Sequence, residues 1–507
     1  MNSNKKIKSA LISVYYKQGL EVLIQELKKQ NVTIYSTGGT QKFIEELGLE
    51  VIPVEDITSY PSILGGRVKT LHPKVFGGIL ARRENHQDLL QLTEYQIPEI
   101  DLVVVDLYPF EETLNSGAST EEIIEKIDIG GVSLLRAAAK NYKDVAVVSS
   151  PVLYQNVAEM LHAAEGCLTL EQRKKLAAES FSVTSKYDTL ISSYFSEKNS
   201  ANLNLSFSEK STLRYGENPH QKASFYSTGL PMIEKLSGKE LSYNNLLDVD
   251  ASVQLIEEFE ECTFAIIKHN NACGIASRKT VQEAYKAAFD ADTVSPFGGV
   301  LICNRSITIE AATEINNLFF EVLIAPSLEE EALELLTKKP NRIILKRTSE
   351  KFPKNNYRSV LNGVLEQERD AKLVDKAELK ISTELAPTEL ELEDLLFANK
   401  IVKHSKSNTI ILAKNKQLLG SGVGQTSRVD ALKQAIQKAN TFNLSLENSS
   451  MASDAFFPFS DCVEIAAQAG VTSIIQPGGS IRDKDSVEMC DKMKISMVFS
   501  GIRHFKH

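Results

Sequence analysis

The stretch Thr-Phe-Ala-Ile-Ile-Lys-His-Asn-Asn-Ala-Cys-Gly (263–274) joins a run of apolar residues to a polar end. The apolar run predicts a buried strand, and the asparagines at 270–271 and Gly274 are typical of the turn that ends a strand. Reacting groups in α/β folds commonly lie where strands end. Lys268 and His269 lie at this point, and an imidazole beside an ammonium can move a proton and stabilise a developing anion. Taken alone, the pair is explained better by a solvated turn, so its interpretation depends on the rest of the chain.

Short apolar runs alternate with helical patterns along the whole chain. Continuous apolar strands separated by helices predict an α/β fold, in which parallel sheets are covered on both faces. We expect strands at 9–14, 32–35, 101–106, 144–149, 262–267, 299–303, 409–413 and 472–476, and helices at 19–30, 41–47, 151–195, 280–289, 431–439 and 461–469. Residues 199–211 are polar and predict a linker between an N-terminal domain (1–198) and a C-terminal region (212–507) of two subdomains. The stretches 410–424 and 473–479, each a strand followed by glycines, suggest duplicated halves.

Composition excludes several classes of protein. The chain has 507 residues, of which 42% are hydrophobic and 24% charged, and its net charge is −9. An acidic chain of this kind is not expected to bind nucleic acid or a membrane surface, and no apolar stretch is long enough to span a bilayer. Six cysteines without a Cys-x-x-Cys pair fit the reducing cytoplasm and carry no zinc signature. We therefore expect a cytoplasmic protein that requires no metal.

Two N-terminal segments predict an anion site. The segment 64–83 contains five basic residues and no carboxylate, and its paired glycines allow a close backbone approach. In an extended segment Arg67 and Lys69 project to the same side. A second segment precedes a helix and offers backbone N–H groups to a phosphate; it consists of Ser36, Thr37, Gly38, Gly39 and Thr40. Each segment is also typical of an ordinary turn, but together they predict a phosphorylated small molecule.

Two further segments carry polar groups at strand or helix ends. Val-Asp-Leu-Tyr-Pro-Phe (105–110) ends a strand with the phenol of Tyr108, and Ile-Asp-Ile-Gly-Gly-Val (127–132) leads from Asp128 into a helix that ends at Lys140. Simpler explanations exist for two of them. A lysine suits the dipole at a helix C-terminus, and an aspartate before two glycines is a common turn residue.

Longer motifs within these segments resemble a known family. They are Leu-Gly-Gly-Arg-Val-Lys-Thr-Leu-His-Pro (64–73), Asp-Leu-Tyr-Pro-Phe (106–110) and Ile-Asp-Ile-Gly-Gly-Val-Ser-Leu-Leu-Arg-Ala-Ala-Ala-Lys-Asn (127–141). They are similar to the inosine monophosphate (IMP) cyclohydrolase half of the bifunctional purine-biosynthesis enzymes. The resemblance continues through the other half, the transformylase of 5-aminoimidazole-4-carboxamide ribonucleotide (AICAR). It implies an N-terminal methylglyoxal-synthase-like domain of Rossmann type and a C-terminal cytidine-deaminase-like region, without the deaminase Pro-Cys-x-x-Cys zinc motif.

The resemblance implies roles for N-terminal residues in closing formyl-AICAR to IMP. Lys69 and Tyr108 are expected at the formyl oxygen, Asp128 at the amide proton and Lys140 as a further charge. The nucleotide and its phosphate are expected to contact Ser13, Lys17, Ser36, Thr37, Gly38, Gly39, Thr40, Arg67 and Thr70. One departure from the pattern is Val-Tyr-Tyr-Lys (14–17), because many relatives carry Val-Ser-Asp-Lys there.

The resemblance also implies a transformylase site that uses 10-formyl-tetrahydrofolate as cosubstrate. His269 is expected to deprotonate the AICAR amine, Lys268 to stabilise the oxyanion and Asn408 to bind the formyl oxygen. Further ligands are expected at Arg214 and Tyr215, donated across a homodimer interface, Glu321 at the carboxamide, Phe456 and Phe457 as a pterin wall with Asp461 as its anchor, and Arg503 and His507 in a C-terminal tail that packs into the site. A buried aromatic turn explains each phenylalanine nearly as well.

The leading prediction is a homodimeric bifunctional enzyme that handles AICAR, formyl-AICAR, IMP and folate. In a first alternative, the N-terminal domain is only a regulatory module for a phosphorylated ligand, beside an active transformylase. The combination of Lys69, Tyr108, Asp128 and Lys140 argues against it, because a sensor needs a phosphate loop but not this set. A zinc deaminase and a scaffold are weaker alternatives, since the first needs a cysteine pair and the second explains none of the polar motifs.

Overall fold

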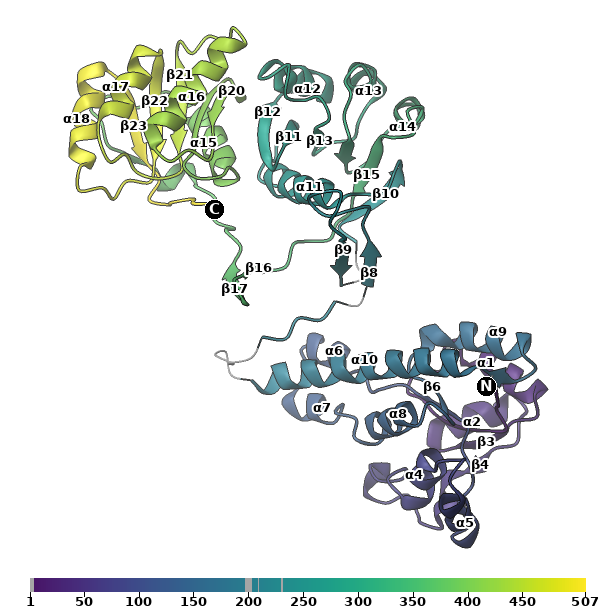
Figure 1. The fold of residues 1–507 in the computed structure, drawn as a ribbon. Coiled ribbons are helices and arrows are strands. Elements are labelled where there is room, and N and C mark those ends of the chain that lie inside the picture. Colours follow the sequence, from purple (N-terminus) through teal and green to yellow (C-terminus); the bar gives the residue numbers. More distant parts are fainter. Residues whose placement is uncertain (1–3, 197–202, 208, 229–230) are drawn as a thin grey trace. The chain divides into compact units, whose positions relative to one another are not determined.

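The computed structural model describes residues 4–196, 203–207, 209–228 and 231–507. The chain divides into two compact units after Ser206 (Figure 1). This division lies within the predicted linker 199–211, of which residues 199–202 and 208 lie outside the described residues. Strand β8 (Glu209–Thr212) begins within the same stretch and pairs with β9 (Ser224–Ser227). Its side chains are all exposed, so no apolar pattern marks it in the sequence.

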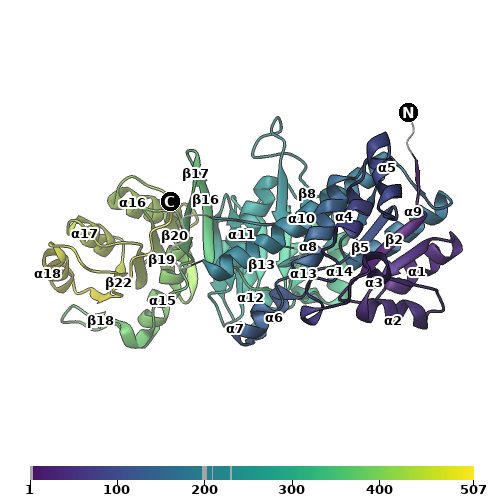
Figure 2. The same ribbon diagram turned by 90° about the horizontal axis from the view of Figure 1, so that it is seen from below.

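Parallel strands form the centre of unit 1. Its described part contains a five-stranded sheet in the order β4-β3-β2-β5-β6, made of β2 (Ser9–Ser13), β3 (Thr33–Ser36), β4 (Ile52–Pro53), β5 (Leu102–Val105) and β6 (Ala146–Val148). Every residue of β5 and β6 is buried, which requires cover on both faces of the sheet. Helices lie on both sides of the strands in Figure 2. The predicted doubly covered parallel sheet is therefore confirmed.

The helices of unit 1 supply the rest of its core. They are α1 (Leu20–Lys29), α2 (Gly38–Glu46), α3 (Val54–Thr58), α4 (Pro73–Leu80), α5 (His86–Glu94), α6 (Phe110–Asn115), α7 (Thr120–Ile124), α8 (Gly130–Lys140), α9 (Tyr154–Ala163) and α10 (Leu170–Phe195). The predicted helical block 151–195 is two helices, because Gly166 (φ 83°) leads into the short strand β7 (Cys167–Leu168), which pairs with β1 (Lys5–Lys6). Helices α3, α4, α5 and α6 were not predicted, and α4 carries two glycines.

Unit 2 is built from two halves with the same order of elements. The first runs α11 (Tyr243–Ile256), β11 (Thr263–Lys268), β12 (Asn271–Ser277), α12 (Val281–Asp290), β13 (Val300–Cys303), α13 (Ile309–Ile315), β14 (Val322–Ala325), α14 (Glu330–Thr337) and β15 (Ile343–Arg347). The second runs α15 (Glu389–Lys403), β19 (Ile410–Lys414), β20 (Gln417–Gly422), α16 (Arg428–Thr441), β21 (Ser449–Ser453), α17 (Asp461–Gln468), β22 (Val471–Gln476), α18 (Asp483–Met493) and β23 (Ser496–Phe499). The predicted two subdomains correspond to these halves.

The two halves share one sheet. In the described part of unit 2, twelve strands lie in the order β10-β15-β14-β13-β11-β12-β20-β19-β21-β22-β23-β18, where β10 spans Ile233–Ser237 and β18 spans Lys380–Ile381. The halves join where Ala276 of β12 pairs with Gln417 of β20. The hairpin β16 (Asn355–Val360) and β17 (Gly363–Glu368) lies between the halves in sequence. Duplication is thus present, but the expected match of 410–424 with 473–479 is wrong, because β19–β20 corresponds to β11–β12.

The hairpin β11–β12 corrects the predicted turn after Lys268. Its two turn residues are His269 (φ 51°) and Asn270 (φ 64°), and the return strand already begins at Asn271. A two-residue turn with two positive φ angles matches the twist of the flanking strands. Gly274 therefore lies within β12, where a Cβ atom would come 1.9 Å from the carbonyl oxygen of Ala288 on α12.

Candidate active sites

A cavity in unit 1 collects most of the predicted N-terminal residues. It measures ≈ 980 Å³, and its lining includes Ser13, Lys17, Thr37, Gly39, Thr40, Arg67, Lys69, Thr70, Tyr108 and Asp128. Ser36 does not line it, because this buried hydroxyl donates to the carbonyl of Ile12 at 2.6 Å. Gly38 acts by being small, since a Cβ atom there would lie 3.2 Å from Nζ of Lys69.

One end of the cavity gathers positive charge. Helix α2 begins there at Gly38, and the ammonium of Lys17 donates to the carbonyls of Val14 and, at 3.0 Å, of Tyr15. Burial lowers the pKa of Lys17, and the nearby charge of Lys69 lowers it further. Two ammonium groups beside a helix N-terminus form a site suited to a phosphate.

The same cavity is also lined by a carboxyl group, that of Asp128, and by a phenol, that of Tyr108. Asp128 is buried, and its Oδ1 accepts a hydrogen bond from the backbone N–H of Gly131 at 2.7 Å. Burial raises the pKa of Asp128 above its usual range. Burial also raises the pKa of Tyr108, and the charge of Asp128 adds to this effect. A carboxylate with a raised pKa accepts a proton more readily, and a protonated phenol can donate one.

The basic segment 64–83 is not extended, which corrects the expected geometry. Gly65 (φ 65°) and Gly66 (φ 85°) curl the chain ahead of Arg67, so Arg67 and Lys69 meet the cavity from a turn rather than from one side of a strand. The guanidinium of Arg67 also pairs with Glu125.

Two further basic residues of this segment pair with acidic side chains. Arg82 pairs with Asp88 at 2.9 Å, and Arg83 lies 3.6 Å from Glu99. The second glycine pair, at 77–78, lies within α4, where a Cβ on Gly78 would come 2.4 Å from the carbonyl oxygen of Pro98. These glycines permit helix packing and do not approach an anion.

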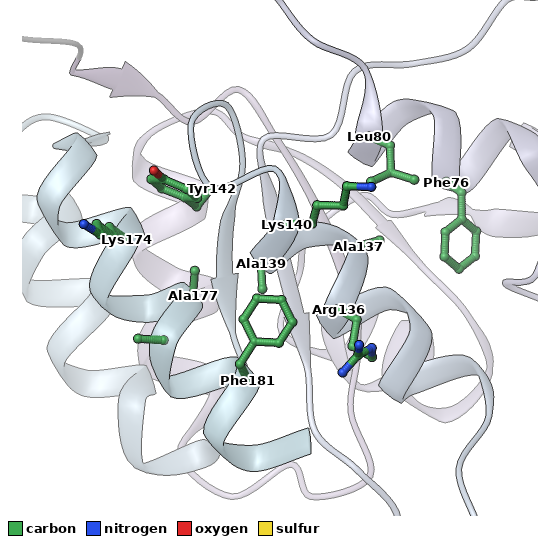
Figure 3. A pocket seen from close by; sticks show the side chains of 11 residues that line it. Phe76, Leu80, Arg136, Ala137, Ala139, Lys140, Tyr142, Lys174, Ala177 and Phe181 are labelled. Atoms are coloured by element: carbon green, nitrogen blue, oxygen red, sulfur yellow. The ribbon is translucent and has the colours of Figure 1, made fainter. Parts of the chain in front are cut away.

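Lys140 lies apart from the cavity within one chain. It is the last residue of α8, whose first residue, Gly130, lines the cavity. Leu134 of the same helix also lines the cavity, and six residues of helix, about 9 Å, separate it from Lys140. Lys140 instead lines a second hollow of ≈ 650 Å³, shown in Figure 3 with Arg136 and Phe181. A single chain thus joins Lys69, Tyr108 and Asp128 but not Lys140.

The departure at 14–17 places an aromatic ring at the cavity. Tyr15 lines it, and its ring meets that of Tyr108 edge-on with 5.7 Å between centroids. The ammonium of Lys126 lies 5.4 Å from the Tyr15 centroid. The backbone N–H groups of Tyr15 and Tyr16 both donate to the carboxylate of Asp106. The phenol at position 15 is therefore held against a predicted catalytic residue.

In unit 2, Lys268 and His269 lie at the tip of the hairpin β11–β12. The ammonium of Lys268 donates to the carbonyl of Phe297 at 2.8 Å. Asp248 on α11 accepts a hydrogen bond from the backbone N–H of Asn270 at 2.7 Å. Burial raises the pKa of Asp248, against the charges of His269 and Lys268. This carboxylate fixes the turn that carries the dyad.

Asn271 connects the dyad to the segment before Asn408. Its amide nitrogen donates to the carbonyl of His269 at 2.8 Å, and its oxygen accepts from the backbone N–H of Lys406 at 3.3 Å. Asn408 follows two residues later. Its side-chain oxygen accepts from Arg428 at 2.9 Å, and Arg428 forms a buried ion pair with Asp454 at 2.7 Å.

Glu321 lies near Asp248, the carboxylate that holds the turn at residues 269–270. It accepts a hydrogen bond from the side-chain amide of Asn245 on α11 at 3.0 Å and lies 3.4 Å from the ammonium of Lys239. The loop with Arg214 and Tyr215 is tied to α11 through Asn244, which donates to the carbonyl of Glu217 at 3.1 Å. The guanidinium of Arg214 lies 4.9 Å from the Tyr215 ring centroid.

The predicted aromatic wall needs one correction. Phe457 is fully buried in the core of the second half, so it has no face free for a ligand. The exposed rings are Phe456 (38%) and Phe459 (53%). Phe459 was not predicted as part of this wall, although it directly follows Pro458 in the same loop. Asp461 begins α17, and its Oδ1 accepts from the backbone N–H of Cys462 at 2.8 Å.

The C-terminal tail runs along the residue that precedes Asn408. Ser407 donates its backbone N–H to the carbonyl of Lys506 at 2.9 Å, and its hydroxyl accepts from the N–H of Lys506 at 3.1 Å. The carbonyl of His507 accepts from Arg358 at 2.9 Å. The guanidinium of Arg503 lies 4.5 Å from the centroid of the Phe505 ring.

The sequence does contain one signal for Asp248, which the sequence analysis missed. In the second half, Asp394 accepts hydrogen bonds from the turn residues Asn415 (2.8 Å) and Lys416 (2.6 Å). Asp248 precedes Asn270 by the same interval, 22 residues, that separates Asp394 from Lys416. Aligning the sequences of the two halves of unit 2 therefore places Asp248 opposite Asp394.

The described residues hold no group of three or more His, Cys, Asp or Glu side chains arranged for a metal ion. No helix among them is long and apolar enough to cross a membrane. The expectation that no metal is required stays a prediction.

Comparisons with known proteins cover the whole chain. The model of the AICARFT/IMPCHase bienzyme family matches residues 138–438, and that of the MGS-like domain matches residues 19–133. The bifunctional purine biosynthesis protein PurH of Bacteroides thetaiotaomicron is 57% identical over 507 residues, 100% of both chains. The PurH proteins of Acetivibrio thermocellus and Bacillus subtilis are 48% and 47% identical, over 99% of this chain and 100% of theirs. The chain therefore belongs to the AICARFT/IMPCHase bienzyme family, the bifunctional PurH proteins of purine biosynthesis with AICAR transformylase and IMP cyclohydrolase activity.

Proposed function

We propose that unit 2 transfers the formyl group of 10-formyl-tetrahydrofolate to the amine of AICAR, and that unit 1 closes the resulting formyl-AICAR to IMP. The observation that carries the assignment of unit 1 is the grouping of Lys69, Tyr108 and Asp128 around one cavity with a cationic end. A sensor for a phosphorylated ligand needs only that cationic end.

In the closing step, the carboxamide nitrogen attacks the formyl carbon and a C–N bond forms. Asp128 accepts the proton of the attacking nitrogen, for which its raised pKa is suited. Lys69 and Tyr108 stabilise the oxygen that becomes negative. The departing water takes that oxygen, one proton from the carboxamide nitrogen and one from the formamide nitrogen. Binding the phosphate at the cationic end holds both reacting groups in contact.

In the transfer step, the AICAR amine attacks the formyl carbon of the folate. His269 takes the amine proton and returns one to the departing folate nitrogen, while Lys268 stabilises the oxyanion. Asn408 orients the formyl oxygen, and its own amide is oriented by Arg428. We assign the carboxamide of AICAR to Glu321 and the pterin to Phe456 and Phe459, whose rings are exposed.

We infer that the working unit is a homodimer. Arg214 and Tyr215 reach a transformylase site from the partner subunit, and the exposed position of Arg214 leaves it free to do so. Lys140 acts at the closing ring of the partner, because it lies about 9 Å along α8 beyond Leu134, the last residue of this helix that lines the cavity of its own subunit. The enzyme works in the reducing cytoplasm, which agrees with six free cysteines.

The experiment that tests this assignment follows AICAR and 10-formyl-tetrahydrofolate over time with the purified protein. We expect formyl-AICAR to appear transiently and IMP to accumulate in an amount equal to the tetrahydrofolate released. Release of free formate in place of IMP, or formyl-AICAR that persists, contradicts the proposal for one of the two units.

A further inference from the structure

Two cysteines meet at the end of β11 that lies opposite the Lys268–His269 turn. Cys262 immediately precedes β11, and Cys303 is the last residue of β13. Phe264 pairs with Cys303 across these antiparallel strands. Residues two apart on a strand share a face, so Cys262 and Cys303 are diagonal neighbours on one face of the sheet. The two thiols lie close enough for each to shift the pKa of the other.

The two thiols differ in access. Cys262 is partly exposed, whereas Cys303 is only 2% exposed. The backbone N–H of Arg305 donates to Sγ of Cys303 at 3.4 Å, which fixes the buried sulfur beside its neighbour. An accessible thiol next to a buried partner is the arrangement in which the first reacts and the second resolves the product.

We propose that Cys262 and Cys303 form a reversible disulfide when a hydroperoxide reaches Cys262, which makes this end of β11 a site of oxidative modification. The Cys262 thiolate attacks one peroxide oxygen, the O–O bond breaks, and Cys262 becomes a sulfenic acid. The sulfur of Cys303 then attacks that of Cys262, the S–O bond breaks and an S–S bond forms. Each cysteine loses one electron, and hydrogen peroxide is reduced to two waters, which also take up the two thiol protons.

The ionisation of the cysteines agrees with this order of events. The neighbouring thiol of Cys303, together with the charge of Arg305, lowers the pKa of Cys262 to about 7. The neighbouring Cys262 raises the pKa of Cys303 above its usual range, so Cys262 reacts first, and the contribution of its negative charge ends when Cys262 is oxidised. Burial raises the pKa of Cys273, Cys462 and Cys490 to about 12, so these three are poor nucleophiles.

The modification leaves formyl transfer intact. β11 has six residues between Cys262 and His269, a separation of about 20 Å along an extended strand. The bond joins strands that already pair. We therefore expect formyl transfer by the oxidised protein to stay within about twofold of the reduced protein.

The test treats the full-length protein with hydrogen peroxide at near-equimolar ratio, blocks free thiols with N-ethylmaleimide and maps the peptides by mass spectrometry. We expect one cross-linked pair, Cys262–Cys303, that dithiothreitol reverses. Cys167 is the matched control, because it is also partly exposed and its partner on the neighbouring strand is Lys6 rather than a cysteine. A thiol half ionised at pH 7 reacts about tenfold faster than an ordinary thiol, so N-ethylmaleimide should modify Cys262 about tenfold faster than Cys167.

Two variants separate the roles of the cysteines. Cys303→Ser should leave Cys262 as a sulfenic acid that dimedone traps and that excess peroxide carries to the sulfinic acid. Cys262→Ser should abolish the cross-link and the fast reaction. Two results on the unaltered protein overturn the proposal whether or not the variants fold. One is sulfinic acid at Cys262 without a cross-link, and the other is an equal reaction rate at Cys262 and Cys167.

Discussion

Asp248 accepts the backbone N–H of Asn270 at 2.7 Å and so fixes the turn on which His269 stands at a positive φ of 51°. A non-glycine residue in this region is strained by about 1 kcal/mol or more, so the turn needs a partner that holds it. Asp394 holds the equivalent turn of the second half. Only the first half carries a lysine–histidine dyad at this position.

Asp248→Ala should lower kcat for formyl transfer by about 10- to 100-fold, because a catalytic group displaced by about 1 Å loses up to that factor. Cyclisation of supplied formyl-AICAR should not change. Asp394→Ala is the matched control, since it removes the same support from a turn without the dyad. Equal losses of formyl transfer in the two variants, with both folds intact by circular dichroism, contradict a positioning role for Asp248.

Tyr15 gives a second prediction, for unit 1. Tyr15→Ser should lower kcat for cyclisation by about 2- to 10-fold, because an edge-on aromatic pair contributes about 0.5–1.5 kcal/mol. Tyr15→Phe keeps the ring against Tyr108 and should behave like the unaltered protein. Steady-state assays with formyl-AICAR measure both variants. If the phenylalanine variant loses as much as the serine variant, the hydroxyl and not the ring contact is what matters.

The pKa of Asp128 predicts opposite effects on activity and stability. Because burial raises this pKa, cyclisation should increase with pH as the carboxyl ionises, with a midpoint above the usual 3.9 or so of aspartate. The folded state binds the proton more tightly than the unfolded state, so the free energy of unfolding falls as pH rises between the two pKa values. The Asp128→Asn variant should lose cyclisation, and its residual rate should no longer rise with pH through the ionisation of this carboxyl. At pH 7 the variant should have a higher Tm than the unaltered protein. A lower Tm for this variant counts against an ionised buried carboxyl.

The dimer proposal predicts complementation between two inactive variants. Lys140→Ala and Asp128→Asn damage different contributions to one site if the partner supplies Lys140. After equal amounts of the two proteins are mixed and their subunits exchange, about half of the dimers should be hybrids with one intact site of two, and cyclisation should return to about a quarter of the unaltered rate. Mixtures that stay as inactive as their components show that Lys140 does not act across subunits.

Substitutions of three phenylalanines in one loop distinguish rings that contact the folate from a ring that packs in the core. Phe456→Ala and Phe459→Ala should raise KM for the folate with little change in Tm, because both rings are exposed. Phe457→Ala should instead lower the free energy of unfolding by about 3–5 kcal/mol, because its ring is fully buried. Folate titrations and thermal melts distinguish these outcomes. A raised KM for Phe457→Ala alone, at unchanged Tm, contradicts the assignment.

Sequence patterns predicted the elements whose side chains are buried on one or both faces. The strands at 102–105 and 263–268 are such elements, since continuous burial requires continuous apolar residues. Helix α4 was missed because Gly77 and Gly78 weaken the helical pattern while their small size permits packing against Pro98. Phe457 was misassigned because neither composition nor spacing shows which ring of an aromatic loop faces the core.

Lys69, Tyr108 and Asp128, which line one cavity, were predictable because each belongs to a motif that the sequence shows directly. Asp248 escaped notice because its partner, the turn at 269–270, lies on another element and is reached only in three dimensions. Lys140 shows the converse. It belongs to the same motif as Asp128, yet the length of α8 separates the two within one chain.

The central claim is that one chain holds two independent active sites, and paired variants test it most directly. Lys268→Ala should abolish formyl transfer while IMP still forms from supplied formyl-AICAR. Lys69→Ala should still make formyl-AICAR from AICAR and 10-formyl-tetrahydrofolate, which then accumulates without closing to IMP. If either substitution eliminates both reactions while the protein stays folded, the two activities do not reside in separate sites and the account is wrong.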